Sequence, residues 1–361
     1  MRYSSIRDLD WVMVIIAIMI SGVGILQIYS ATHGTQWQSS WWKQIVFVGV
    51  GLLIMWVMAA IDYHSLMGKA PIMYTASVAL LVAVLIIGAK IFGSRRWIPV
   101  FGFTFQVSEF MKVVMVIVMA RLLTELRSDI LDGWELTKLG AVVGIPMLLV
   151  RAQPDLGTAL TYLPILGIGI YLAGLRKEYL LVIVMLVGLA PVVAWRFMHD
   201  YQKARLVSFL NPEQDPRGAG YQQIQSMIAV GAGGMWGQGV AKGSQTQLRF
   251  LPVAQTDFIF SAFAEEHGFI GVIGVLALYF VLLMQIVQNA QTAPDRAGMY
   301  ICMGVVALFV FHLFVNVGMV VGRMPVVGIP LPLMSAGGSN TLSTFLMLGL
   351  VNNVRLRRFV N

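Results

Sequence analysis

The chain has 361 residues, of which 58% are hydrophobic and only 12% are charged, with a net charge of +8. Soluble domains carry roughly 25% charged residues, so this composition excludes an ordinary soluble protein and predicts an all-α polytopic membrane protein. The single cysteine, Cys302, excludes a disulfide framework within the chain and a thiolate metal cluster. The charge forms no basic block of the kind that binds nucleic acid, but it suits anionic headgroups or a phosphate-bearing substrate.

Ten apolar segments are each near the roughly 20 residues that a helix needs to cross a bilayer. They are expected at residues 11–29, 42–61, 71–89, 107–123, 139–150, 159–175, 179–197, 257–287, 299–321 and 335–351. The eighth is too long to stand upright, so we expect it to tilt or to break near Gly268. No cleavable signal is visible before the first segment, which therefore predicts a retained membrane helix. We expect one integral membrane domain over residues 1–361, with a long loop at 198–256 between the seventh and eighth helices.

Lysine and arginine residues in the short loops predict the orientation of the chain. One side collects Arg2, Arg7, Lys69, Arg121, Arg127, Lys138, Arg176, Lys177, Arg296, Arg355, Arg357 and Arg358, and the other holds Lys43, Lys90, Arg95, Arg96, Arg151 and Arg323. The richer side is expected to be cytoplasmic. This orientation predicts a multi-pass protein of the cytoplasmic (inner) membrane with both termini inside and the 198–256 loop outside.

The long loop does not have the composition of a disordered linker. Ile224, Met227 and Ile228 fall at helical spacing, which predicts a short helix lying on the membrane. The glycines on both sides of Trp236 predict tight turns.

Asp257 stands where the long loop meets the eighth span, between Thr256 and Phe258. Thr256 is a residue type that caps a helix, and this helix would then enter hydrocarbon. The position leaves one carboxylate near the membrane surface, beside a helix N-terminus. This position of Asp257 is compatible with a role in starting the helix and with a role in catalysis. The helix N-terminus would lower the pKa of Asp257, whereas partial burial would raise it.

Glu109 and Lys112 open the fourth span, three residues apart and hence on one helical face. An ion pair that only reduces the cost of burial is one interpretation. Polar groups inside a membrane helix usually face an interior cavity and mark function, which favours the other.

The 93–97 segment lies between the third and fourth spans, on the expected outer side. Arg95 and Arg96 supply two guanidinium groups, whose planar shape matches the oxygens of a pyrophosphate. Trp97 next to them is explained equally well as an anchor at the membrane interface.

Two more polar segments fall on the same side. Residues 153–158 predict a tight turn in which Asp155 satisfies backbone donors. Residues 335–340 open the last helix with hydroxyls, including Ser339, and with backbone donors suited to an anion, although capping alone also explains them. A transporter would place its polar groups near the midplane, so this outer grouping favours an enzyme that acts on a lipid-borne substrate.

Taken together, these motifs resemble the SEDS family (shape, elongation, division and sporulation), and RodA more closely than FtsW. The resemblance covers nearly the whole chain and is carried by residues 93–97, 108–112, 153–158, 256–260, 264–266 and 328–339. It implies a ten-helix peptidoglycan glycosyltransferase that polymerises lipid II and works with a class B penicillin-binding protein. It also implies that Asp257 is catalytic and that Trp97, Glu109 and Lys112 are functionally important.

Three positions depart from the family pattern. Arg249 stands where an acidic residue is frequent, Gln255 where histidine is frequent, and Ala336 where tyrosine is common. The first two argue against a mechanism that needs a second acid or a histidine beside Asp257. None of the three removes Asp257 itself.

The expected reaction is glycosyl transfer outside the membrane, from a polyprenyl-pyrophosphate-linked sugar to the 4-hydroxyl of the GlcNAc of another lipid II. Asp257 would be the general base. Lys112, Arg95 or Arg96 would offset charge on the leaving pyrophosphate, and Glu109 would orient Lys112. A divalent cation, Mg²⁺ or Mn²⁺, is compatible with the same task, although the sequence shows no dedicated ligand cluster.

Alternatives from other classes stay open. A lipid II flippase or transporter would still move substrate when Asp257 is replaced by alanine, and a non-catalytic scaffold would not need Asp257. A division-type polymerase like FtsW is the alternative within the family. The expected partners are lipid II, the penicillin-binding transpeptidase, the elongation machinery and membrane lipids, without nucleic acid.

Overall fold

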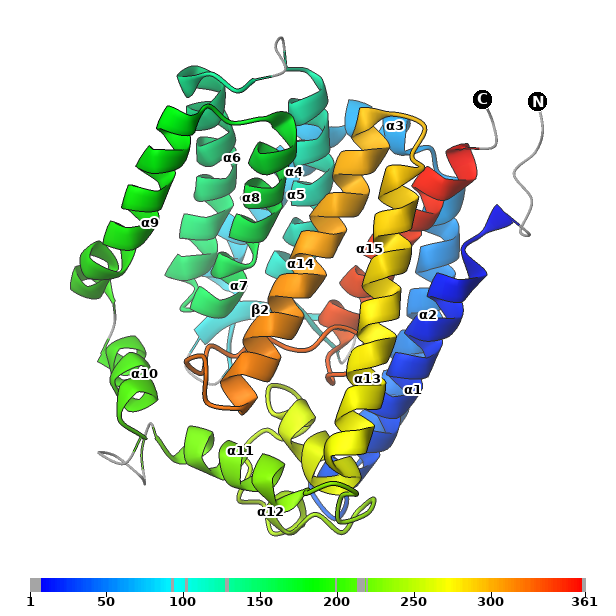
Figure 1. The fold of residues 1–361 in the computed structure, drawn as a ribbon, viewed down its shortest axis with the longest axis vertical. Helices are drawn as coiled ribbons and strands as arrows, with labels where there is room; N and C mark the ends of the chain where they lie inside the picture. Colours follow the sequence, from blue (N-terminus) through cyan, green and yellow to red (C-terminus); the bar gives the residue numbers. More distant parts are fainter. Residues whose placement is uncertain are drawn as a thin grey trace.

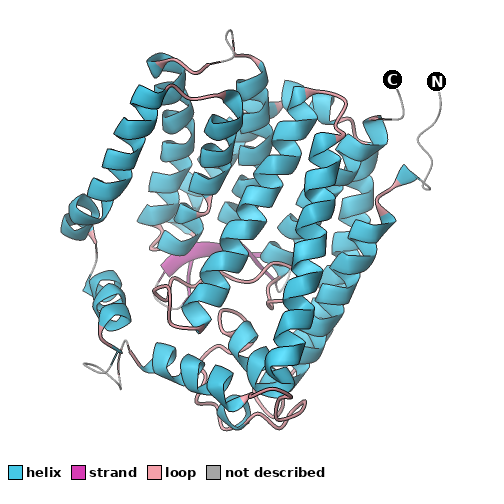
Figure 2. Cartoon of the chain, viewed as in Figure 1, coloured by secondary structure: helices cyan, strands magenta, loops and turns pink. Residues whose placement is uncertain are grey.

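The computed structural model describes residues 8–91, 94–100, 103–126, 130–198, 200–212, 218 and 220–358. Gly93 of the 93–97 segment, and the basic residues Arg2, Arg7 and Arg127 used for the orientation, lie outside the described residues. The described chain is a bundle of long helices that carries a short sheet at one end (Figures 1 and 2).

The helices are α1 (Trp11–Thr32), α2 (Ser40–Ala60), α3 (Tyr63–Gly68), α4 (Ala70–Ile87), α5 (Val107–Thr124), α6 (Gly133–Ala152), α7 (Leu156–Leu160), α8 (Tyr162–Ala173), α9 (Lys177–Phe197), α10 (Asp200–Leu210), α11 (Tyr221–Ala232), α12 (Ser244–Gln247), α13 (Ile259–Gln291), α14 (Arg296–Val320) and α15 (Gly338–Arg357). The strands are β1 (Ala89–Ile91), β2 (Ser94–Val100) and β3 (Phe103–Phe105).

A helix or a helix pair occupies the position of every predicted span. Among the residues that the structure describes, seven spans are long and apolar enough to cross a membrane: α1, α2, α4, α6, α7 with α8, α13 and α14. The expectation of a polytopic membrane protein therefore has support from both length and composition. Helix α5 is not among the seven, because Glu109, Lys112 and Arg121 put three charges into its 18 residues.

Local chemistry explains where individual helices start and break. α6 begins at Gly133, earlier than expected, because Asp132 and Glu135 form a capping box in which each carboxylate accepts the other residue's N–H. α13 breaks at Gly268, as predicted, with φ 64° and ψ −168°. A Cβ at Gly268 would lie 2.3 Å from the backbone nitrogen of Gly237, so this contact between two backbones requires glycine.

The start of α13 differs from the expectation. Ile259 is its first residue, Phe258 is the N-cap, and no side chain caps the helix. The Thr256 hydroxyl donates instead to the Val253 carbonyl at 3.3 Å, within the turns that precede the helix. The prediction that Thr256 caps this helix, with Asp257 in its first turn, is therefore wrong. Asp257 belongs to the turn before α13.

The short sheet was not expected from the sequence. β2 is its central strand and pairs antiparallel with β1 on one side and β3 on the other. The 95–97 segment thus lies on a strand and not in an irregular loop. In the 198–256 loop, α11 includes the helical segment predicted around Met227, and Gly234, Gly237 and Gly239 have positive φ, as expected of tight turns.

The two ends of the bundle carry different groups. The first turn of α1, the last turn of α15 and α3 lie at one end, and β2 and α10–α12 lie at the other (Figure 1).

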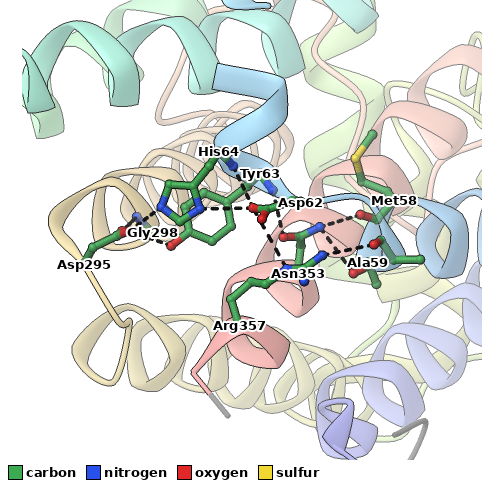
Figure 3. Close-up of polar contacts among 10 residues, drawn as sticks. Met58, Ala59, Asp62, Tyr63, His64, Asp295, Gly298, Asn353 and Arg357 are labelled. Carbon is green, nitrogen blue, oxygen red and sulfur yellow. Dashed lines mark hydrogen bonds and ion pairs between the residues drawn. The ribbon is translucent and has the colours of Figure 1, made fainter. Parts of the chain in front are cut away.

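At the first end, His64 on α3 lies 3.0 Å from Asp62 and 2.7 Å from Asp295 (Figure 3). Burial alone would lower the pKa of His64, but its hydrogen bonds to the two carboxylates outweigh burial and raise it.

Candidate active site

Asp257 is held from two directions. Asn316 on α14 donates its Nδ2 hydrogens to the Asp257 carbonyl at 3.0 Å and to the Ile329 carbonyl at 2.8 Å. A Cβ at Gly328 would lie 3.3 Å from Asp257 Oδ2, so the carboxylate packs against the loop at 325–332. Gly328 has φ 71°, a left-handed conformation that favours glycine.

Burial and the surrounding charges together set the direction of the Asp257 pKa. Burial raises the pKa of Asp257, the positive charges of Arg96 and Arg205 lower it, and the negative charge of Asp155 raises it. The net result is a raised pKa. Burial, one of the two opposing effects expected from the sequence, is the largest of these influences. A carboxylate of raised pKa is better suited to act as a general base near neutral pH.

Arg96 lies between a carboxylate and an aromatic ring. Its Nη1 is 3.2 Å from Asp155 Oδ2, and its guanidinium carbon lies 4.2 Å from the ring centroid of Trp97. Asp155 also accepts the Thr158 N–H at 3.1 Å, as expected of a turn residue, and so caps α7. Arg95 is exposed, because successive residues of a strand point to opposite faces. The charge of Arg96 therefore acts on Asp257, whereas the Arg95 side chain is exposed.

Ser339 belongs to the same group through Gln106. The Ser339 hydroxyl accepts the Gln106 backbone N–H at 2.9 Å, and the Gln106 side-chain amide donates to Asp155 at 2.9 Å. Ser339 does not cap α15, whose N-cap is Gly337. These contacts join the first turn of α15 to the strand region and, through Asp155, to Arg96.

Glu109 and Lys112 form the expected ion pair, with 2.8 Å between Oε2 and Nζ. Their side chains are 4% and 1% exposed, so the pair is inside the bundle. The hydroxyl of Ser343 on α15 donates to Glu109 at 3.4 Å, and His312 Nε2 on α14 lies 3.3 Å from Lys112 Nζ. The predicted pairing on one helical face is confirmed, while a role of either residue towards substrate stays a prediction.

Three residues that sequence reasoning did not single out belong to this site. His312 and Asn316 are both buried and stand four apart on α14, a polar pair on one face of an apolar span that could have been recognised. Arg205 on α10 donates to the Val326 carbonyl at 3.1 Å and acts on the charge of Asp257. Nothing local in the long loop indicated where Arg205 would lie.

The two acidic residues of the 264–266 motif, Glu265 and Glu266, bind the long loop and α1. Glu265 accepts the N–H groups of Gln245 at 2.7 Å and Thr246 at 3.0 Å, and so caps the short helix α12. Glu266 accepts hydrogen bonds from Gln27 and Ser30 of α1. These carboxylates hold the long loop and α1 against α13, and their partners are not those of Asp257.

In the part of the chain that the structure describes, no three Asp, Glu, His or Cys side chains meet as a metal site. A dedicated protein cage for Mg²⁺ or Mn²⁺ is therefore not formed by these residues.

A family model described as a cell cycle protein, FtsW/RodA/SpoVE, matches residues 8–358. The peptidoglycan glycosyltransferase MrdB of Escherichia coli is 40% identical, over 88% of this chain and 85% of its own length. The peptidoglycan glycosyltransferase RodA of Treponema pallidum is 31% identical over 99% of this chain and its own full length. A solved structure described as a peptidoglycan synthase complex that coordinates polymerization and crosslinking contains a chain with a TM-score of 0.84 and 32% identity, covering 98% of this chain and 99% of that one.

Proposed function

This chain belongs to the FtsW/RodA/SpoVE family of cell cycle proteins, and we infer that it is a peptidoglycan glycosyltransferase of cell elongation. Its substrate is lipid II, which it polymerises into glycan strands. The elongation role follows from the RodA and MrdB relatives, which match the chain along most of its length. The observation that carries the site assignment is the Asp257 carboxylate, with its raised pKa, beside two arginines and the loop at 325–332.

Asp257 is the general base of this proposal. It takes the proton from the 4-hydroxyl of the acceptor GlcNAc while that oxygen forms a bond to the anomeric carbon of the donor. The bond from the anomeric carbon to the pyrophosphate oxygen breaks, and the pyrophosphate leaves with the electron pair on its polyprenyl carrier. General base catalysis of this kind typically contributes about 10²–10⁴ in rate.

The cations near Asp257 suit the leaving group. Arg96 is partly exposed and is oriented by Asp155 and by the ring of Trp97. Arg205 is oriented by the Val326 carbonyl. Guanidinium groups fixed in this way offset developing charge on a pyrophosphate without reorganising during the reaction.

Lys112 has a different position from the arginines. Because its side chain is 1% exposed, it contributes through its positive charge from within the bundle, and Glu109 holds it in place. A buried charge acts over a longer range than an exposed one, because water screens it less. Arg95, on the exposed side of β2, would meet substrate only at the rim of the site. Ser339 supports the site through Gln106.

The arrangement in the membrane follows the charge distribution. We place ten membrane helices in a single domain over residues 1–361, with both termini in the cytoplasm and the 198–256 loop outside. The basic residues of the short loops support this orientation. The location of β2 and α10–α12 at the end of the bundle opposite α3 is compatible with it (Figure 1). The reaction then takes place on the outer face of the cytoplasmic membrane.

The partner of this activity would be a class B penicillin-binding protein, which crosslinks the strands. The similarity to a chain of a peptidoglycan synthase complex, over 98% of this chain, supports such a pairing.

Proteoliposomes separate polymerisation from transport. Fluorescent lipid II is incorporated together with the purified protein, and two products are followed: glycan strands on a gel, and labelled lipid that reaches the opposite leaflet. We expect strands from the wild type and none from Asp257→Asn. Transport that persists in Asp257→Asn, without strands from either protein, would replace the polymerase with a flippase.

A further inference from the structure

One face of α14 carries two buried polar side chains, His312 and Asn316. Residues four apart on a helix are neighbours on its surface, so the two side chains point the same way. Both contact the loop at 325–332: His312 contacts the Pro330 carbonyl and Asn316 contacts the Ile329 carbonyl, each at 2.8 Å. Two consecutive carbonyls of one loop are thus fixed by one helix.

The hydrogen-bond partners determine the tautomer of His312. A carbonyl oxygen can only accept, so Nδ1 carries the hydrogen that is donated to Pro330. Nε2 then presents a lone pair. The Lys112 ammonium, 3.3 Å from Nε2, can only donate. It therefore needs Nε2 as an acceptor, which agrees with the hydrogen on Nδ1 that Pro330 requires. His312 is therefore a neutral imidazole that links the loop to Lys112.

These contacts fix the direction of the Lys112 ammonium. One of its three hydrogens is directed to Glu109 at 2.8 Å and a second to His312. Tetrahedral geometry then sets the direction of the third. Among the described residues, the hydrogen-bond partners found for Lys112 Nζ are Glu109 and His312.

The same helix face also reaches Asp257. Asn316, one turn from His312, donates to the backbone carbonyl of Asp257 at 3.0 Å. The loop that His312 and Asn316 hold contains Gly328, which packs against the Asp257 carboxylate. A displacement of the α14 face would therefore move the base and the buried cation together.

We propose that His312 is a positioning residue for the transfer reaction: it accepts a hydrogen bond from Lys112, donates one to Pro330, and so aligns the buried cation with the loop against which Asp257 packs. The proposal rests on the proposed function, because it assigns His312 a part in the same reaction. A histidine that served only to complete its own hydrogen bonds inside the bundle would affect stability alone. The positioning role predicts instead that loss of the Nδ1 contact and loss of the Nε2 contact change kcat to different extents.

Two substitutions separate these nitrogens. His312→Gln places an amide near the position of Nε2 and keeps an acceptor for Lys112. His312→Asn places an amide near the position of Nδ1, which keeps the donor to Pro330 but loses the contact with Lys112. Cys302→Ala is the matched control, because Cys302 is buried on the same helix, ten residues before His312.

The expected result is a difference in kcat. His312→Asn should lower kcat by about 10–100-fold with KM changed less than about threefold, because misplacement of a group that acts in the transition state reduces turnover. His312→Gln should stay within about fivefold of the wild type, and Cys302→Ala should leave kcat unchanged. Thermal unfolding of each variant shows that the protein is folded at the assay temperature.

The experiment measures lipid II polymerisation by the wild type, Asp257→Asn, the two His312 variants and the control in one series. Equal losses in both His312 variants, proportional to their loss of thermal stability, would overturn the positioning role while the polymerase assignment stands. A fully active His312→Asn beside an inactive His312→Gln would overturn it too, because the loop contact alone would then matter. A wild type that makes no strands would overturn the proposed function and the inference with it.

Discussion

Gly328 offers a direct way to disturb the Asp257 carboxylate without replacing it. In Gly328→Ala, the new Cβ would lie 3.3 Å from Asp257 Oδ2, a distance at which the carboxylate must move by a few tenths of an ångström. The residue also has φ 71°, where a non-glycine residue costs roughly 1–2 kcal/mol. The substitution therefore combines a backbone cost with a displacement of the proposed base.

Gly34 is a matched control for the backbone cost. Its φ is 64°, and a Cβ there would meet nothing within 4 Å. Gly34→Ala should therefore lose the same roughly 1–2 kcal/mol of stability and leave the site untouched. Thermal unfolding followed by tryptophan fluorescence compares the stabilities, and initial rates of strand formation compare the activities.

We expect similar losses of stability in the two variants and a loss of kcat, about tenfold or more, in Gly328→Ala alone. Full activity of Gly328→Ala at a temperature where it is folded would contradict this expectation, because the carboxylate would then tolerate a shift. Equal losses of activity in both variants would also refute it, since strain and not contact with Asp257 would be the cause.

Three other changes have defined outcomes. Glu109→Leu leaves Lys112 buried without its carboxylate and should cost about 3–5 kcal/mol in thermal unfolding, whereas adding Lys112→Met should restore most of this stability and leave strand formation abolished. Activity should fall as the pH drops through the raised pKa of Asp257. Arg96→Gln removes a positive charge that lowers this pKa, so it should move the acid limb of the kcat/KM profile to higher pH. An unchanged acid limb would contradict the assignment of Asp257 as the base. The pKa of His64 is raised in the folded protein, so protonated His64 stabilises the fold. This stabilisation is complete below about pH 6.5 and is lost as the pH rises through the folded-state pKa. The difference in Tm between the wild type and His64→Gln should therefore shrink from pH 5.5 to pH 8.5.

Features that depend on neighbouring residues in the chain could be predicted from the sequence. A long apolar run must form its hydrogen bonds within itself in a membrane, so hydropathy located the helices, although α6 begins six residues before its predicted span and α15 ends six residues after its own. The spacing of Glu109 and Lys112 fixed them on one face, and their ion pair followed. Gly268 was recognised as a break because its span exceeds the bilayer thickness.

Contacts between distant segments could not be predicted in the same way. Arg205 meets the site because its side chain reaches from α10 to the Val326 carbonyl, 121 residues further along the chain, and no local pattern encodes that contact. β1 and β3 have only three residues each, too few to show a period of two, and the seven residues of β2 do not alternate between apolar and polar. The cap at Thr256 failed because its hydroxyl found the Val253 carbonyl within a turn, a competing bond that short polar side chains often make.

The most direct test of the account is polymerisation of labelled lipid II by the purified protein, with its cognate transpeptidase present, for the wild type and Asp257→Asn. The substitution keeps the shape of the side chain and removes the base, so thermal unfolding should be nearly unchanged. We expect glycan strands from the wild type and none from the folded variant. Strands of equal length and yield from both proteins would contradict this expectation, and would leave Asp257 a structural residue of the turn before α13.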